Sequence, residues 1–156
     1  HFTPFAGIVY DVSDAWSVYA SYTDMFEPQD SRDRNGHYLD PLLGKNEEIG
    51  AKGELLDGRL TASFALFRSS QDNFAMVDEG QKVPGTIDDA YYSVDGVEAK
   101  GVEMELNGEI SEGWNLFLGA SATRLRDENG DRFKTNQPNR TLKLFTTYDL
   151  KDDLSN

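Results

Sequence analysis

The chain has 156 residues and no cysteine, which is enough for one ordinary domain but offers neither disulfides nor thiolate chemistry. Its net charge of -13, from 28 acidic and 15 basic residues, argues against nucleic acid as a partner, because a phosphate backbone attracts a basic surface. Only 38% of the residues are hydrophobic, and no apolar run approaches the roughly 20 residues of a transmembrane helix. Helical membrane spans are thereby excluded, but a barrel is not, since barrel strands are apolar only at every second position.

Period-two alternation of apolar and polar residues predicts an all-β chain. About seven strands are expected, near residues 3–10, 16–25, 47–56, 59–70, 98–110, 114–126 and 140–150. Most of them have roughly ten residues or more, whereas strands of soluble sheets usually have about five or six. A tilted strand needs about nine to eleven residues to cross a bilayer. The strand lengths therefore favour a membrane barrel over a soluble sandwich.

The segment 102–110 shows the alternation most clearly. Val102, Met104 and Leu106 fall on one face, while Glu103 and Glu105 fall on the other. Charged side chains in a dry core without partners would cost several kcal/mol each. We therefore expect one face of the sheet to meet lipid and the other to meet water or a polar partner.

Short turns and long loops alternate along the chain. The turns fall near residues 11–15, 57–58 and 111–113, and the long connections span residues 27–46, 71–95 and 127–139. In an antiparallel up-and-down meander, this order places all the turns at one end and all the long loops at the other. Bacterial outer-membrane barrels have this asymmetry, with short periplasmic turns and longer outer loops.

Aromatic residues gather near the end that carries the tight turns. Trp16 and Trp114 each follow a short turn, and Tyr10 and Tyr148 lie near the same end. Such rings favour the headgroup zone of a membrane. Aromatic residues are also common in any strand, so a soluble sheet remains an alternative.

No catalytic, metal-binding or cofactor-binding constellation is visible, so we do not expect an enzyme. His1 and His37 lie at a terminus and in a loop, away from any serine in a nucleophile context. The acidic segment 127–131 lacks the spacing and the closing glutamate of a calcium loop, and its Asn-Gly pair is typical of a turn. Binding through the long loops is the remaining function that the residues themselves suggest.

The long loops carry exposed aromatic residues that could stack against a large planar ligand. They could equally pack the loops against each other. The candidate ligand-binding residues are Tyr38, Phe74, Tyr91 and Tyr92.

Several segments, taken in order, resemble the barrel of TonB-dependent ferric-siderophore receptors of the outer membrane, within the hydroxamate and pyoverdine branch. The segments are residues 14–23 (DAWSVYASYT), 26–29 (FEPQ), 44–54 (GKNEEIGAKGE), 57–60 (DGRL), 65–68 (ALFR), 71–73 (QDN), 101–106 (GVEMEL), 113–116 (GWNL) and 142–148 (LKLFTTY). Single pieces are weak signals, but their order and spacing together are fairly specific, and they run almost from end to end of the chain.

The resemblance implies a segment of a 22-stranded transmembrane β-barrel, which in the family encloses an N-terminal plug. It further implies that a ferric siderophore binds between plug and outer loops, and that TonB drives uptake. The plug itself is not expected within residues 1–156, which would form a partial barrel domain. The polar face would then line the lumen and meet the plug and water through Glu48, Lys52, Glu54, Glu103, Glu105, Asn107 and Lys143.

Two rival hypotheses remain. One is a soluble acidic β-domain that binds a protein or a glycan and closes its apolar faces into a dry core. The other is a passive porin, which shares the strand pattern. Seven strands cannot close a 22-stranded barrel, and open sheet edges are not tolerated in hydrocarbon. The chain is therefore expected to be part of a larger receptor or a piece taken from one.

Overall fold

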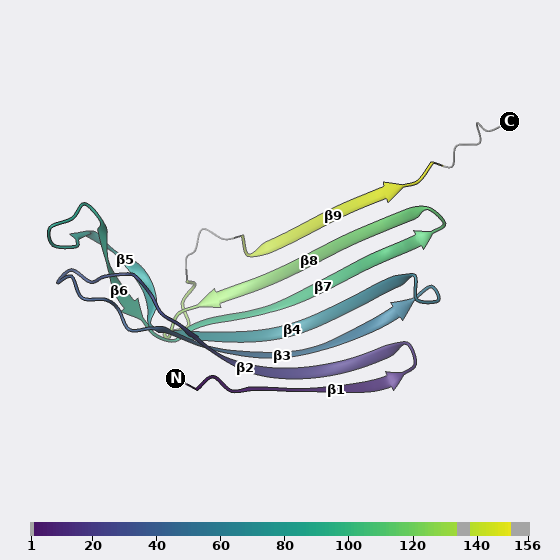
Figure 1. The fold of residues 1–156 in the computed structure, drawn as a ribbon, viewed down its shortest axis with the longest axis horizontal. Helices are drawn as coiled ribbons and strands as arrows, with labels where there is room; N and C mark the ends of the chain where they lie inside the picture. The colour runs from purple at the N-terminus through teal and green to yellow at the C-terminus, as the bar shows by residue number, and fades with distance from the viewer. Residues whose placement is uncertain (1, 134–137, 151–156) are drawn as a thin grey trace.

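The computed structural model describes residues 2–133 and 138–150 of the chain (Figure 1). The secondary-structure elements of the described residues are all β-strands, and none of these residues belongs to a helix that could cross a membrane. The strands are β1 (Phe5–Ser13), β2 (Trp16–Glu27), β3 (Leu42–Leu55), β4 (Leu60–Asp72), β5 (Phe74–Lys82), β6 (Asp89–Val94), β7 (Val97–Ser111), β8 (Trp114–Arg126) and β9 (Arg140–Tyr148).

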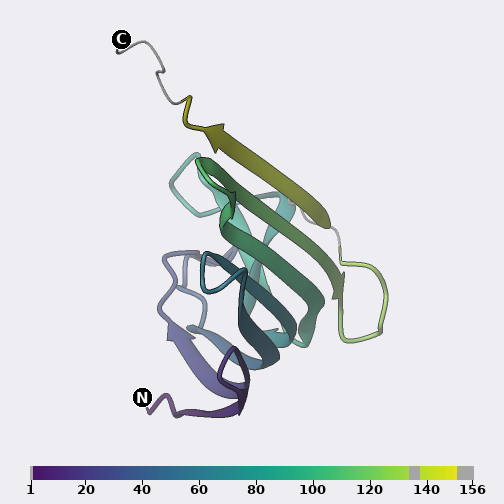
Figure 2. The ribbon, with the colours of Figure 1, turned by 90° about the vertical axis from the view of Figure 1, so that its right-hand side faces the viewer.

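Seven of these strands form one antiparallel sheet in the order β1-β2-β3-β4-β7-β8-β9, which follows the chain. The connections β1–β2, β3–β4 and β7–β8 are tight turns at one end of the sheet, and the long connections all lie at the other (Figure 1). The predicted up-and-down meander of about seven long strands is confirmed. Figure 2, which looks from the tight-turn end, shows the strands following one another along a curved and twisted wall.

The β5–β6 hairpin is a feature that the sequence prediction missed. Residues 71–95 were expected to form a loop, but β5 and β6 pair with each other as a separate two-stranded sheet beyond the end of the large one. The hairpin was hard to recognise because its pairing shifts register between Val77 and Lys82, which breaks the alternation. The structure also lengthens β3, which begins at Leu42 instead of about residue 47.

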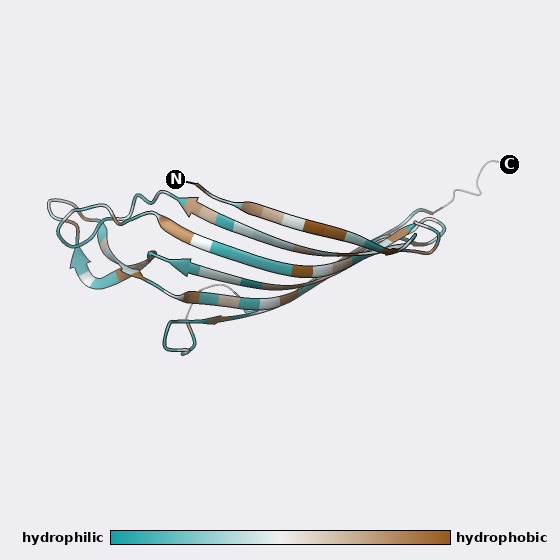
Figure 3. Cartoon of the chain, turned by 90° about the horizontal axis from the view of Figure 1, so that it is seen from below, coloured by the Kyte–Doolittle hydropathy of each residue, from teal (hydrophilic) through white to brown (hydrophobic). Residues whose placement is uncertain are grey.

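The strand register shows that the apolar positions of neighbouring strands share one face. Phe64 on β4 lies opposite Ala51 of β3 and Met104 of β7, and Met104 lies opposite Ala120 of β8. Side chains of directly opposed residues point to the same side of a sheet. We call this side the outer face, and the opposite side the polar face. Figure 3 shows hydrophobic and hydrophilic residues alternating along the strands, as this two-faced arrangement requires.

The outer face is open rather than packed. Phe64 is 46% exposed, whereas its neighbour Ala65 on the polar face is only 8% exposed. Side chains crowd together on the inside of a curved sheet and spread apart on the outside, so the polar face is the concave one. The hydrophobic residues that are buried among those described are Leu60, Ala65, Val83, Ala90 and Val97. A core this small does not match the closed, dry core that the soluble-domain hypothesis required.

Aromatic residues mark the tight-turn end of the outer face. The ring of Trp16 covers Gly53 on β3 so closely that a Cβ added there would clash with the indole. Trp114 packs edge-on against Tyr148 with ring centroids 6.5 Å apart, and its Nε1 donates a 2.7 Å hydrogen bond to Thr146. The aromatic residues therefore gather on the outer face near the turns, where a membrane-interface girdle was predicted.

Candidate functional site

The long connection between β2 and β3 packs against the β5–β6 hairpin. The backbone N–H of Tyr91 in β6 donates a 2.8 Å hydrogen bond to the carbonyl of Arg32. Arg34 reaches Asp78 of β5 with two donors, Nε at 2.9 Å and Nη2 at 2.6 Å from the same carboxylate oxygen. Residues 28–41 and the hairpin thus form one connected structure, which we call the outer-loop assembly.

Asn73 holds the base of the outer-loop assembly. Its side-chain amide donates to the carbonyl of Pro41 at 2.9 Å, and its backbone N–H donates to the Asp95 carboxylate at 2.8 Å. Its own carbonyl accepts a 2.7 Å hydrogen bond from Gln29. Asn73 has a φ of 60°, which asparagine tolerates better than most residues. One residue between β4 and β5 therefore joins residues 28–41 to the β6–β7 connection at the point where the hairpin leaves the sheet.

Two of the four predicted ligand-binding residues are well exposed. Tyr38 is 60% exposed and Tyr92 is 46% exposed. The Arg32 guanidinium lies 4.6 Å from the centre of the Tyr38 ring and donates a 2.7 Å hydrogen bond to its hydroxyl. This cation–π contact fixes the ring at the surface without covering both of its faces.

The other two predicted residues, Phe74 and Tyr91, are less accessible to a ligand. Phe74 packs edge-on against Phe133 of the loop after β8, with ring centroids 5.5 Å apart. Tyr91 is half-buried and lies opposite Val77 in the hairpin ladder. The structure thus brings Tyr91 and Tyr38 together through Arg32, and it gives Phe74 a packing contact.

A hollow of about 630 Å³ lies between the hairpin and the loop after β8. Met76 and Tyr92 line one side, and Arg132 and Phe133 line another. Three carboxylates, from Asp95, Asp127 and Glu128, also line it, together with Ser93 and Val94. This hollow was not predicted from the sequence, because its walls come from two segments, residues 76–95 and 127–133, that are distant in the chain.

The residues predicted to line the lumen all lie on the polar face. Lys52, Glu105 and Lys143 belong to one row across the sheet, with Ser63 and Gly119 between them. Glu54 and Asn107 belong to the next row toward the tight turns, and Glu48 and Glu103 lie toward the loops.

Tyr19 gathers three of these lumen residues around its side chain. Its hydroxyl donates a 2.6 Å hydrogen bond to Glu48, and Lys52 Nζ lies 5.3 Å from its ring centre. Glu103 is close enough to interact with the same hydroxyl electrostatically. Sequence reasoning left Tyr19 out because its own strand alternates only weakly at that point.

Asp33 organises the tip of residues 28–41. Its carboxylate accepts hydrogen bonds from the backbone N–H groups of Asn35 at 2.9 Å and His37 at 2.8 Å. These donors, the His37 amide foremost, lower the pKa of Asp33 below its ordinary value. His37 acts mainly through its backbone N–H, and its imidazole Nδ1 also lies 3.7 Å from the other oxygen of the Asp33 carboxylate.

The acidic segment 127–131 forms a turn. Asp127 accepts hydrogen bonds from the backbone N–H groups of Asn129 and Asp131 at 3.0 and 2.9 Å. Gly130 has a φ of 80°, as the turn requires. No cluster of potential metal ligands occurs within residues 2–133 and 138–150.

Comparison with known proteins identifies the family. Residues 1–155 match the model described as "TonB dependent receptor-like, beta-barrel". The chain is 49% identical over 151 residues to the ferric-pyoverdine 358 receptor of Pseudomonas putida. This match covers 95% of this chain but 18% of that receptor. It is 43% identical to the ferripyoverdine receptor of Pseudomonas aeruginosa, where the match covers 98% of this chain and 19% of the receptor.

Comparison with solved structures supports the same family. The crystal structure of the Pseudomonas aeruginosa ferripyoverdine receptor of the outer membrane, bound to ferripyoverdine, superposes with a TM-score of 0.80 at 41% identity, over 99% of this chain and 21% of that one. The alcaligin outer-membrane receptor of Bordetella pertussis gives 0.76 at 39% identity, over 99% and 27%. The chain thus spans about a fifth of the receptors that it matches, as expected for part of a larger barrel. It belongs to the family of TonB-dependent receptor-like β-barrels, which are outer-membrane receptors and not enzymes.

Proposed function

We propose that this chain supplies part of the barrel wall and of the outer loops of a receptor that takes up a ferric siderophore of the pyoverdine type. The observation that carries the proposal is the identity of 49% to a ferric-pyoverdine receptor over a match covering 95% of the chain. A match of that extent includes the long loops as well as the strands. Neither the soluble-domain hypothesis nor the porin hypothesis accounts for it.

Within this proposal, the outer-loop assembly contributes to the siderophore site. Tyr38 and Tyr92 present exposed rings at the loop end. Aromatic rings of this kind stack well on a planar organic ligand. Tyr91 and Phe74 stabilise the assembly: Tyr91 through its hydrogen bond to the Arg32 carbonyl, and Phe74 through its contact with Phe133. The ferric siderophore is the transported ligand, and no resident cofactor is proposed.

The polar face would contact the plug and water inside the complete barrel. Its charges alternate in sign along the row from Lys52 through Glu105 to Lys143. A lining of this kind suits a hydrated protein surface better than hydrocarbon. Energy coupling through TonB is assigned to parts of the receptor outside this chain.

A chimaeric receptor tests the proposal. Residues 1–155 replace the matching segment of the Pseudomonas putida ferric-pyoverdine 358 receptor, and the chimaera is expressed in cells that lack their own pyoverdine receptor. We expect saturable binding of the ferric pyoverdine and uptake that requires TonB. A chimaera that reaches the outer membrane but binds neither ferric pyoverdine nor ferrioxamine B would refute the proposal.

Two variants of the chimaera test the loop residues. Combined Tyr38→Ala and Tyr92→Ala substitutions should weaken binding about tenfold, because each lost aromatic contact costs about 0.5–1.5 kcal/mol. The control is Tyr10→Ala, which removes a tyrosine of β1 that is more exposed than either and lies near the opposite end of the sheet. Unchanged binding in the double variant would remove these two residues from the site.

A further inference from the structure

The outer face changes from apolar to basic at one level across three neighbouring strands. Arg68 on β4 lies opposite Lys100 on β7, and Lys100 lies opposite Arg124 on β8. Two positions closer to the tight turns, the corresponding row contains Leu66 and Val102. Because residues two apart in a strand share a face, the basic row continues the apolar face and does not belong to the polar one.

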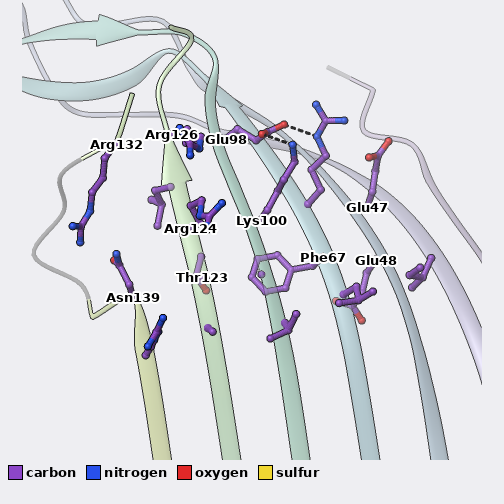
Figure 4. Close-up of a pocket in the computed structure, with 18 residues that line it drawn as sticks. Glu47, Glu48, Phe67, Glu98, Lys100, Thr123, Arg124, Arg126, Arg132 and Asn139 are labelled. Atoms are coloured by element: carbon purple, nitrogen blue, oxygen red, sulfur yellow. Dashed lines mark hydrogen bonds and ion pairs between the residues drawn. The ribbon is translucent and has the colours of Figure 1, made fainter. Parts of the chain in front are cut away.

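Further arginines surround this row. Arg126, Arg132 and Arg140 line the same surface hollow as the three basic residues of the row, and Figure 4 shows several of them around it. Six of the chain's 15 basic residues line this hollow, against three of its 28 acidic residues. In a chain whose net charge is -13, such a local excess of positive charge is a distinct feature. We call it the outer basic cluster: Arg68, Lys100, Arg124, Arg126, Arg132 and Arg140.

Internal ion pairs neutralise only part of the outer basic cluster. Glu98 binds Arg68 at 2.6 Å and Lys100 at 2.7 Å, and these pairs are drawn in Figure 4. Among residues 2–133 and 138–150, no carboxylate pairs with any of the other four arginines. All four side chains are exposed. By their register, Arg124, Arg126 and Arg140 lie on the outer face and therefore present positive charge to whatever lies beside it.

The cluster lies at the height of the outer headgroups. Trp114, in the aromatic girdle, and Arg124 lie ten residues apart on β8. At about 3.3 Å per residue and a tilt of about 40°, their separation along the membrane normal is about 25 Å. The apolar band of outer-membrane barrels is also about 25 Å tall. With the tight turns on the periplasmic side, the outer basic cluster borders the lipid of the outer leaflet.

We propose that the outer basic cluster binds the phosphate groups of an anionic lipid whose acyl chains lie against the apolar outer face. Guanidinium groups match phosphate oxygens in charge and in geometry, since they can donate two parallel hydrogen bonds. Because the apolar face runs directly into the cluster, the acyl chains of one lipid can lie against the apolar residues while its phosphates reach the arginines. This proposal uses the membrane orientation of the barrel and does not depend on which siderophore is bound.

The test compares lipid A with dephosphorylated lipid A on the chimaeric receptor, purified in detergent and analysed by native mass spectrometry. We expect the phosphorylated form to be retained preferentially. Combined Arg124→Gln and Arg140→Gln substitutions should weaken that retention about tenfold, in keeping with the attraction of basic residues to anionic membrane surfaces. The matched control is Arg59→Gln, which removes one arginine in the turn before β4, at the other end of the sheet.

Ferric-pyoverdine binding by each variant reports whether the receptor still folds, and it should stay unchanged. The proposal is wrong if both forms of lipid A bind equally, or if Arg59→Gln reduces retention as much as the double variant. It is also wrong if the double variant abolishes a concentration-dependent dimer while lipid retention stays the same. That last result would assign the outer basic cluster to a second copy of the receptor.

Discussion

The orientation of the sheet can be tested with one lysine placed on either face at the same height. Met104 lies on the outer face opposite Ala120, which is six residues from Trp114 and four from Arg124 on β8. It is therefore close to the middle of the apolar band. Met104→Lys keeps an unbranched side chain of similar length but adds a charge that would face hydrocarbon. The matched change is Ser63→Lys on the polar face, where Ser63 lies opposite Glu105 on the adjacent strand β7.

A basic residue at the midplane of a barrel's lipid face costs about 2–4 kcal/mol, and the cost falls to about 0–1 kcal/mol near the interfaces. Met104→Lys in the chimaeric receptor should therefore destabilise it by about 2–4 kcal/mol. Ser63→Lys should cost less than about 1 kcal/mol, since its new charge meets water and a carboxylate. The assay is reversible unfolding by guanidinium chloride in lipid vesicles, extrapolated linearly to zero denaturant. Equal costs for the two variants, or a larger cost for Ser63→Lys, would refute the assignment of the faces.

Two further predictions concern residues 28–41. Asp78→Asn removes the ion pair with Arg34, whose side chain is 57% exposed, so the loss of local stability is limited to about 0.5–1 kcal/mol. Tryptic cleavage after Arg34 should therefore become about two- to fivefold faster. The control Glu79→Gln should leave the cleavage rate unchanged. Backbone N–H groups, that of His37 foremost, stabilise the Asp33 carboxylate and lower its pKa, so the turn should be intact above the ordinary aspartate pKa and loosen as pH falls through the lowered pKa. Carboxyl-carbon NMR shifts of labelled aspartate check this, and a titration at or above the ordinary aspartate pKa would contradict it.

Local alternation was sufficient to predict the faces of the sheet. The segment around Met104 and Glu105 assigns each residue to a side, and the tight turns then fix how one strand is aligned with the next. The long loops were less predictable, because their structure depends on contacts distant in sequence. Nothing in the sequence indicates that Asn73 would join Pro41 and Asp95, or that Arg34 would find Asp78. Such polar contacts depend on where the hairpin folds, which the pairing of β5 with β6 determines.

The basic row illustrates what register adds to local pattern. Within each strand, Arg68, Lys100 or Arg124 is simply a charge at a position where the alternation calls for an apolar residue. In a soluble sheet, such exceptions have no reason to fall at one height in neighbouring strands. Here the three are directly opposed across β4, β7 and β8. With strands about 4.8 Å apart and tilted by about 40°, opposed residues differ in height by about 3 Å per strand, so the three charges fall within about 6 Å along the membrane normal. A membrane boundary imposes a common height on every strand that crosses it, because each strand leaves the hydrocarbon at the same level. The alignment of the three charges is therefore an independent argument that the outer face meets lipid.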